Sequence, residues 1–210
     1  MKNDRKIRVL VADDHPVVRE GLCSLVNRQD DMKVVAEAGT GREAFEQFLR
    51  HKPDVALIDL RMPEMSGTEA IAAIREQIPA AQAVVITTYS GDEDVYQSLR
   101  AGAKAYLLKD APRDELLSCI RAVHEGRTWI SSEAAAHLAS RMSTRQLSPR
   151  ELEVLRMMAT GKSNKEIGAA LHVTEGTIKM HVNHILKKLE VAGRGEAISQ
   201  AIKRGIVHVG

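Results

Sequence analysis

The stretch Val9-Leu10-Val11-Ala12-Asp13-Asp14 decides the fold of this 210-residue chain, because it is an apolar run that ends in two carboxylates. The same pattern recurs at residues 55–59, which end in Asp59, and at residues 105–109, which end in Lys109. Short apolar runs of this kind predict buried strands of a parallel sheet. Functional groups gather at the carboxyl ends of parallel strands, so we expect the three carboxylates and the lysine to meet at one edge.

The first 124 residues alternate apolar runs with amphipathic stretches. Strands are expected over residues 7–12, 32–38, 55–59, 83–87 and 105–109, and helices over residues 16–28, 41–50, 66–77, 93–101 and 112–125. This alternation predicts an α/β domain with helices on both faces of a sheet. Five such units fit a five-stranded parallel sheet of flavodoxin-like order 2-1-3-4-5.

The remainder of the chain has a helical pattern. Residues 125–146 are interpreted as a linker with one short helix over residues 133–142, which leaves residues 1–124 and 147–210 as two domains. Helices are expected over residues 149–160, 164–171, 175–189 and 194–204. The second and third of these are separated by a short turn at His172-Val173, which predicts an all-α four-helix domain with a helix-turn-helix.

Charge is divided unevenly between the two domains. Residues 1–124 hold 17 Lys+Arg against 20 Asp+Glu, a net of −3, whereas residues 148–210 hold 10 against 6, a net of +4. The basic second half favours a polyanionic partner. No apolar run is long enough to span a membrane, so we expect a soluble cytoplasmic protein. Cys23 and Cys119 are expected to be buried packing residues rather than a disulfide.

The converging polar residues suit phosphoryl transfer, which needs a nucleophile, charge neutralisation and alignment. Asp59 is the candidate nucleophile, because a carboxylate can accept a phosphoryl group. Asp13 and Asp14 would hold Mg²⁺, which prefers oxygen ligands. Lys109 and the Thr87 hydroxyl would contact phosphate oxygens. Tyr106 has an aromatic ring that could rotate.

These residues, Asp13-Asp14, Asp59, Thr87 and Lys109, have the order and spacing by which the chain resembles a bacterial two-component response regulator. The resemblance implies phosphorylation of Asp59 by a sensor histidine kinase. It also implies that Asp14 binds the metal directly, that Asp13 acts mainly through water, and that the Arg61 backbone carbonyl completes the site with Asp59. Thr87 and Tyr106 resemble the switch pair of such proteins.

The third helix of the second domain is expected to face DNA. Its apolar residues recur at helical spacing, which leaves Glu175, Thr177, Lys179, Met180 and Asn183 toward solvent or DNA. Asn can pair with adenine and Lys with guanine. Phosphate contacts, which carry no sequence information, would suit the polar residues Lys162, Lys165, Thr174 and Thr177.

Residues 147–206 resemble the LuxR/NarL-type output domain, most specifically in the string Thr177-Ile178-Lys179-Met180-His181-Val182. By that resemblance Lys179, Met180 and Asn183 face bases, while His181 and Lys187 contact the DNA backbone or pack. The family resemblance implies double-stranded DNA with paired half-sites, a homodimer formed on phosphorylation, and leaves RNA polymerase open as a further partner.

Two alternatives belong to other classes. An aspartate-nucleophile phosphatase often needs a second carboxylate two residues after the nucleophile, and that position is Arg61 here. An atypical regulator that binds DNA without phosphorylation commonly lacks one of the acidic residues, and this chain has all of them. Arg61 and Tyr89 carry large side chains expected to flank the acyl phosphate, which predicts slow autodephosphorylation.

Overall fold

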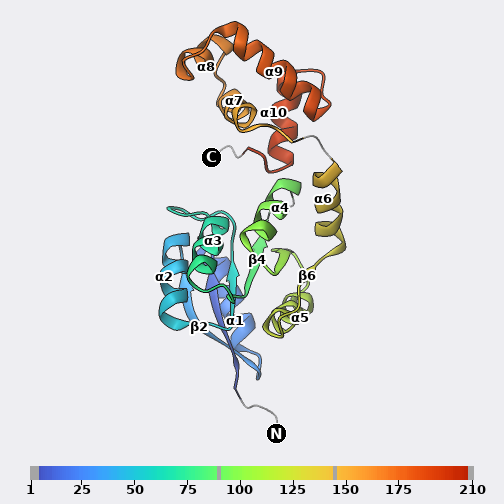
Figure 1. Ribbon diagram of the computed structural model, residues 1–210. Helices are drawn as coiled ribbons and strands as arrows, with labels where there is room; N and C mark the ends of the chain where they lie inside the picture. Colours follow the sequence, from blue (N-terminus) through green and yellow to red (C-terminus); the bar gives the residue numbers. More distant parts are fainter. Residues whose placement is uncertain (1–4, 89–90, 144–145, 208–210) are drawn as a thin grey trace. The chain divides into compact units, whose positions relative to one another are not determined.

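A parallel sheet with helices on both faces forms the first part of the chain (Figure 1). Its strands are β1 (Ile7–Ala12), β2 (Met32–Ala38), β3 (Val55–Ile58), β4 (Ala83–Thr87), β5 (Ala105–Leu108) and β6 (Trp129–Ile130). The helices between them are α1 (Pro16–Asn27), α2 (Gly41–His51), α3 (Gly67–Gln77), α4 (Asp92–Ala101) and α5 (Arg113–His124). The predicted α/β architecture is therefore confirmed.

The predicted strand number is wrong by one. The strand order is β2-β1-β3-β4-β5-β6, and β6 pairs in parallel with β5 through Ala105 with Trp129 and Tyr106 with Ile130. β6 is only two residues long, too short for an alternating or continuous apolar pattern to show in the sequence. It lies within the segment predicted to be a linker.

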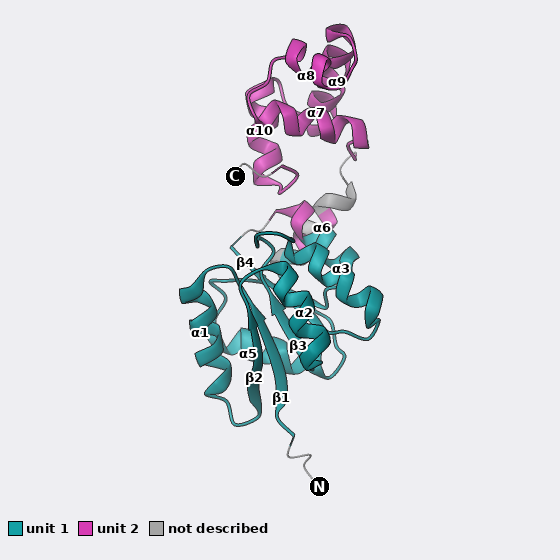
Figure 2. Ribbon diagram, turned by 90° about the vertical axis from the view of Figure 1, so that its left-hand side faces the viewer, with its two compact units in different colours: residues 1–89, 95–135 teal, residues 90–94, 136–210 magenta. Residues whose placement is uncertain are grey.

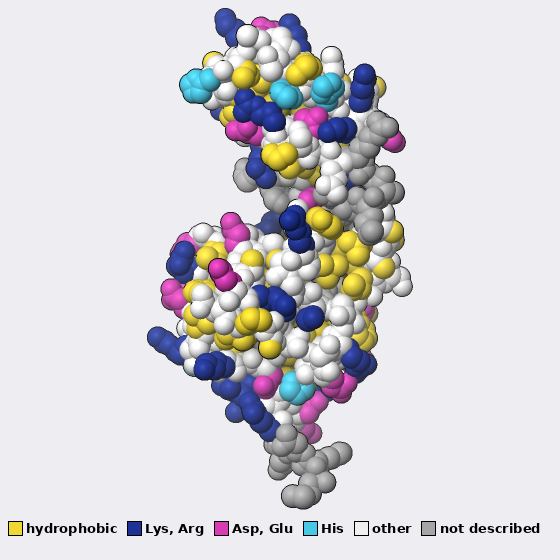
Figure 3. All heavy atoms as spheres, viewed as in Figure 1, with side chains coloured by type: hydrophobic (Ala, Val, Ile, Leu, Met, Phe, Trp, Pro, Cys, Tyr) yellow, Lys and Arg dark blue, Asp and Glu magenta, His cyan; other side chains and the backbone are white. Residues whose placement is uncertain are grey.

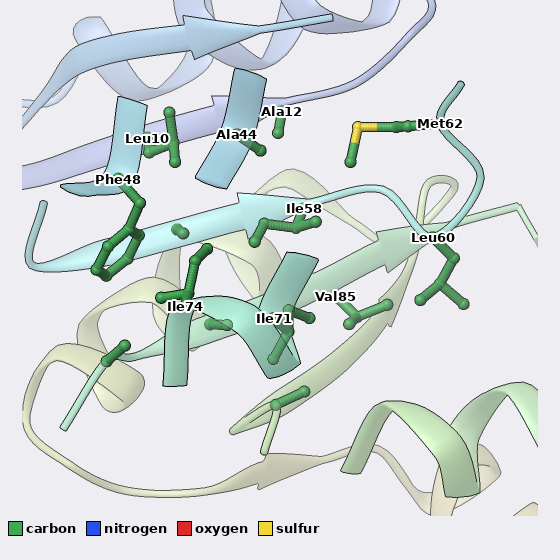
Figure 4. Close-up of a cluster of buried hydrophobic side chains, with 14 of the residues drawn as sticks. Leu10, Ala12, Ala44, Phe48, Ile58, Leu60, Met62, Ile71, Ile74 and Val85 are labelled. Carbon is green, nitrogen blue, oxygen red and sulfur yellow. The ribbon is translucent and has the colours of Figure 1, made fainter. Parts of the chain in front are cut away.

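Two apolar layers hold the helices to the sheet. Cys23 and Val26 of α1 pack with buried residues of α5 on one face. On the other face Phe48 of α2 and Ile71 and Ile74 of α3 point toward β1, β3 and β4 (Figure 4). Each fully buried side chain of this size stabilises the folded state by about 1.5–3 kcal/mol. Because β3 is covered on both sides, all four of its residues are buried, which explains its continuous apolar sequence.

Helices alone form the second part. They are α6 (Ser132–Ser143), α7 (Pro149–Ala159), α8 (Asn164–Ala170), α9 (Glu175–Leu189) and α10 (Arg194–Lys203). The predicted four-helix domain with a helix-turn-helix is confirmed as α7–α10. Its separate core contains Leu155 and Met158 of α7, Ile167 of α8, and Ile178 and Ile185 of α9.

The structure is a computed structural model that describes residues 5–88, 91–143 and 146–207. The chain divides into two compact units, residues 1–89 with 95–135 and residues 90–94 with 136–210 (Figure 2). Within the described residues, none of the helices combines the length and the apolar character needed to cross a bilayer.

Both cysteines are free and buried, as expected. Burial raises the pKa of the Cys23 thiol and of the Cys119 thiol to about 12. They are therefore protonated at neutral pH and serve as packing residues, because the thiolate is the reactive form.

The loop after β3 reaches α3 through a close backbone approach. Ser66 caps α3 by accepting from the Glu69 backbone N–H, and the Glu69 carboxylate accepts from the Ser66 backbone N–H. At the next residue, Gly67, a Cβ would lie 2.0 Å from the backbone carbonyl oxygen of Asp59. Only glycine lets α3 begin this close to the residue after β3.

We expect Gly67→Ala to lower the free energy of unfolding of the first unit by about 1–3 kcal/mol, because the methyl group forces α3 away from Asp59. Gly21→Ala is the matched control, because Gly21 lies inside α1 and a Cβ there meets nothing within 4 Å. That change should stabilise the helix by about 0.5–1 kcal/mol. Urea unfolding followed by the fluorescence of Trp129, the single tryptophan, reports this unit. Equal effects of the two changes would contradict the steric account.

Candidate functional site

The carboxyl ends of β1, β3 and β5 bring two carboxylates and an ammonium group into contact. Lys109 Nζ lies 2.8 Å from Asp13 Oδ2 and 2.8 Å from Asp59 Oδ2. Asp13 and Asp59 are both buried. The backbone aligns the three residues, because Asp59 N–H donates to the Ala12 carbonyl and Lys109 N–H donates to the Thr87 carbonyl. The predicted convergence of these side chains is therefore observed.

Burial and pairing act on these groups in opposite directions. Burial raises the pKa of the Asp59 carboxyl, and the hydrogen bond from Lys109 offsets this only in part. For Lys109 burial lowers the pKa, but the hydrogen bonds to Asp13 and Asp59 outweigh it and the net shift is upward. Lys109 is therefore charged at neutral pH. A cation beside Asp59 would lower the pKa of its carboxyl and so favour the ionised form.

Asp14 and His15 extend the acidic cluster. The ligand atoms offered by Asp13, Asp14, His15 and Asp59 all lie within 4.8 Å of one another. Asp14 Oδ1 is buried and accepts no hydrogen bond from the described residues, although His15 Nδ1 lies 2.6 Å from it. A buried carboxylate oxygen beside two further carboxylates fits a hard divalent cation. His15 was not predicted, and its position directly after Asp14 was the available signal.

The other predicted residues surround this cluster. Thr87, the last residue of β4, is buried, and Tyr106 of β5 is buried with 2% of its surface exposed. Arg61 is half-buried, two residues after Asp59. Tyr89 lies outside the described residues. The roles predicted for these four residues stay predictions.

One supporting residue was missed by sequence reasoning. Arg19 of α1 donates from its guanidinium to the backbone carbonyl of Asp13 at 2.6 Å, and its Nε lies 3.6 Å from Glu37 at the end of β2. Together with the His15 N–H, which donates to Asp13 Oδ1 at 2.9 Å, it holds the turn that carries both acidic residues. An arginine six residues after Asp13 gives no pattern that separates it from an ordinary exposed helical residue.

In the helical unit, a tight turn sets α9 against α8. The turn residue His172 has φ 54°, and the Val173 N–H donates to the Gly168 carbonyl. A Cβ on Gly168 would lie 2.8 Å from the Val173 carbonyl oxygen, so glycine allows the close packing. Thr174 then caps α9 by accepting from the Thr177 N–H. The predicted helix-turn-helix has this turn and this cap.

α9 has one buried face and one exposed face. Ile178, Val182, Ile185 and Leu189 are buried against the other helices. The opposite face exposes Lys179, Met180, Asn183 and Lys187, and 48% of the Met180 surface is accessible. Lys162, Lys165 and Thr174 are exposed and Thr177 is half-buried. On the visible face of this unit, Lys and Arg side chains lie among histidines, apolar groups and some Asp and Glu side chains (Figure 3).

Two polar interactions brace the helix-turn-helix. The Glu151 carboxylate, 4% exposed, accepts from Lys188 Nζ at 2.6 Å and thereby joins the start of α7 to the end of α9. The Arg194 guanidinium of α10 donates to Asn164 Oδ1 at 3.1 Å and to the Lys162 carbonyl. These contacts hold the loop before α8 and the end of α9, where the predicted DNA contacts Lys162 and Lys187 lie.

Family models match both parts of the chain. The response regulator receiver domain matches residues 9–121, and the bacterial regulatory proteins of the luxR family match residues 145–201. This chain belongs to the response regulators with a LuxR-type DNA-binding domain. Members of this family are transcriptional regulators rather than typical enzymes. The family as a whole receives signals from histidine kinases and binds DNA.

Similar proteins match the response regulator over nearly its whole length. The uncharacterised transcriptional regulatory protein YhcZ of Bacillus subtilis is 45% identical over 206 residues, which cover 94% of this chain and 96% of YhcZ. The oxygen regulatory protein NreC of Staphylococcus haemolyticus is 37% identical and covers 96% of this chain and 99% of its own. The crystal structure of the response regulator ChrA of a haem-sensing two-component system aligns with a TM-score of 0.59 at 37% identity, covering 96% and 98% of the two chains.

We expect Glu151→Gln to destabilise the helical unit by about 1–3 kcal/mol at pH 7, because Lys188 loses its carboxylate partner. Burial alone would raise the pKa of Glu151, but Lys188 and the Ser148 donors lower it below the ordinary 4.5. A carboxyl whose folded pKa is lowered stabilises the fold above pH 4.5 and loses this effect as pH falls through the folded pKa. The difference between wild type and variant should therefore shrink below that pH.

Circular dichroism measures this difference, because it follows the helices of both units, while Trp129 fluorescence follows only the first unit. Glu153→Gln is the control. Glu153 pairs with Arg150 at 2.7 Å on the exposed side of α7, where a pair contributes about 0–1 kcal/mol. A loss of stability in Glu151→Gln that is the same at pH 3 and pH 7 would contradict a role for the ionised carboxylate.

Proposed function

We propose that this response regulator is a phosphorylation-dependent transcription factor that accepts a phosphoryl group on Asp59 from a sensor histidine kinase. The observation that carries the proposal is the position of Lys109 Nζ, 2.8 Å from both Asp13 and Asp59, in a member of this family. A fixed cation beside a buried carboxylate is the arrangement that phosphoryl transfer needs, because the incoming oxygens bring negative charge.

In the transfer step, an Asp59 carboxylate oxygen attacks the phosphorus of the kinase phosphohistidine. The new P–O bond forms as the P–N bond breaks, and the imidazole nitrogen leaves with the electron pair and takes up a proton. Lys109 neutralises charge on the phosphoryl oxygens, and the Thr87 hydroxyl donates to another of them. The receiver domain in this reading comprises residues 1–124, followed by a linker over residues 125–146 and an output domain over residues 147–210.

Mg²⁺ is the proposed cofactor. Asp13, Asp14, Asp59 and the backbone carbonyl of Arg61 would hold it, and their oxygen donors match its preference. When bound, the ion supplies positive charge that neutralises the phosphoryl oxygens and the clustered carboxylates. Arg19 keeps the Asp13 carbonyl in place, so the acidic turn is held in position before the ion arrives.

Phosphorylation is proposed to act through Thr87 and Tyr106. The Thr87 hydroxyl would move to the phosphoryl group, and Tyr106 would occupy the inward position behind it. The buried Tyr106 ring supports an inward position that the core can accommodate. The change would favour a homodimer, whose two α9 helices would read paired DNA half-sites about one helical turn apart.

On the DNA, Lys179, Met180 and Asn183 are the proposed base-reading residues. The exposed Met180 suits the thymine methyl group, Lys179 suits guanine and Asn183 suits adenine. Lys162, Lys165, Thr174, Thr177 and Lys187 are proposed to contact phosphates, which fix the register of the helix on the duplex.

Asp59→Asn tests the switch. With acetyl phosphate and Mg²⁺, we expect the wild type to gain one phosphoryl group by mass spectrometry and to shift from monomer toward dimer by light scattering, because Asp59 provides the acceptor oxygen. The variant should do neither. Asp54→Asn is the matched control, since Asp54 precedes β3 and pairs with Arg5 rather than with Lys109.

The same samples separate the proposal from its alternative. Equal, tight binding of duplex DNA by wild type and Asp59→Asn, with no phosphoryl group on either, would overturn the phosphorylation-dependent mechanism. It would favour a regulator that acts without phosphorylation.

Arg61→Ala tests the proposed slow loss of phosphate. We expect the half-life of the Asp59 phosphate to fall severalfold, because removing a half-buried side chain beside the acyl phosphate opens a path for water. Loss of ³²P label over time measures the half-life. Arg50→Ala, at the exposed end of α2, should leave it unchanged. An unchanged half-life in Arg61→Ala would sink this part of the proposal.

A further inference from the structure

Glu175, the first residue of α9, has a different environment from Glu151 and Glu166, which lie in the first turns of two other helices of its unit. Glu151 of α7 and Glu166 of α8 each accept a hydrogen bond from the backbone of their cap residue, so both belong to capping boxes. α9 is capped by Thr174 alone, and its third residue is Thr177. The Glu175 carboxylate is therefore not used in the cap.

The carboxylate instead pairs along the exposed side of the helix. Glu175 Oε1 lies 2.9 Å from Lys179 Nζ, one turn further on, and the two side chains are 46% and 64% exposed. An ion pair this accessible to water contributes little to stability and opens easily. Its place in the first turn suits the helix dipole, but this effect and the exposed pair together give the helix only a modest gain in stability.

A negative charge here also opposes general DNA binding. The proposed function brings this part of α9 to a duplex that carries two phosphates per base pair, and a carboxylate near phosphates lowers affinity for every sequence. A residue with that effect fits a role in discrimination, where repulsion of wrong partners is as useful as attraction of the right one.

The spacing of the two groups matches one kind of base-pair edge. In a G·C pair the guanine O6 acceptor and the cytosine N4 donor are hydrogen-bonded neighbours in the major groove, about 2.9 Å apart. Lys179 Nζ and Glu175 Oε1 present a donor and an acceptor at the same separation. In the reversed C·G pair the amino group would face the lysine and the carbonyl would face the carboxylate, so both contacts would be repulsive.

We propose that Glu175 is a specificity-determining residue that acts with Lys179 to read one G·C pair in one orientation. Lys179 donates to guanine O6 and N7, and Glu175 accepts from the cytosine amino group. A T·A pair also offers an acceptor beside a donor, but it replaces the guanine N7 with the thymine methyl group, which denies Lys179 its second acceptor. This inference rests on the proposed DNA-binding function and deepens it.

The test uses the full-length protein, with and without acetyl phosphate and Mg²⁺, and a random duplex library. Selection with wild type and with Lys179→Ala identifies the base pair that depends on Lys179. Four duplexes that differ only at that pair are then titrated with wild type, Glu175→Ala, Glu175→Gln and Glu153→Ala. The last variant is the matched control, because it removes an exposed ion pair of the same unit outside α9.

We expect wild type and Glu153→Ala to prefer G·C over C·G roughly tenfold, and both Glu175 variants to lose most of that preference. Glu175→Ala should bind an unrelated duplex severalfold more tightly, because one charge opposed to the phosphates is gone. Circular dichroism checks that each variant is folded.

Two other outcomes separate the failures. If the Glu175 variants change affinity by the same factor for all four duplexes, the residue acts on general affinity and the inference is overturned while DNA binding stands. If the wild type binds no duplex at low salt in either state, the proposed function itself fails and the inference with it.

Discussion

The Lys109 ammonium group between Asp13 and Asp59 is the interaction on which the first unit depends. Two carboxylates at the ends of neighbouring strands repel each other strongly when they are buried, and the lysine is the cation that the chain itself provides. The strand register supports its placement: Ala12 pairs with Ile58 at the ends of β1 and β3, and Thr87 pairs with Leu108 at the ends of β4 and β5. The apolar core beneath the site therefore positions the carboxyl ends of these strands.

The two units use charge in different ways. In the first unit, Lys109 pairs with the buried carboxylates of Asp13 and Asp59, and Asp14 adds a further carboxylate to the cluster. A bound cation or anion therefore changes the balance of charge at this site. In the second, Glu151 is buried as a brace while Glu175 and Lys179 remain accessible. Buried pairs are costly to break and fix geometry, whereas exposed pairs exchange partners easily. This contrast is consistent with a receiver domain in the first unit and a DNA-binding domain in the second.

Sequence reasoning succeeded where a pattern repeats over several residues. The buried β3 has an unbroken apolar run, and α7 and α9 begin directly after Ser148 and Thr174, which cap them. β6 was not predicted, because a strand of two residues is too short to show a periodic pattern in the sequence. Arg19 was not predicted because its importance lies in its hydrogen bond to the Asp13 carbonyl, which forms only in the folded state.

β6 also bears on how the sheet avoids edge-to-edge pairing with another chain. A long, flat edge strand offers unpaired backbone groups that another chain can extend. Here the outer edge of β5 is occupied, and the strand that occupies it has only two residues, too few to template a partner. At the opposite edge, β2 exposes the charged side chains of Lys33 and Glu37, which disfavour pairing with a strand of another chain. Both edges of the sheet thus carry features that disfavour pairing with another chain.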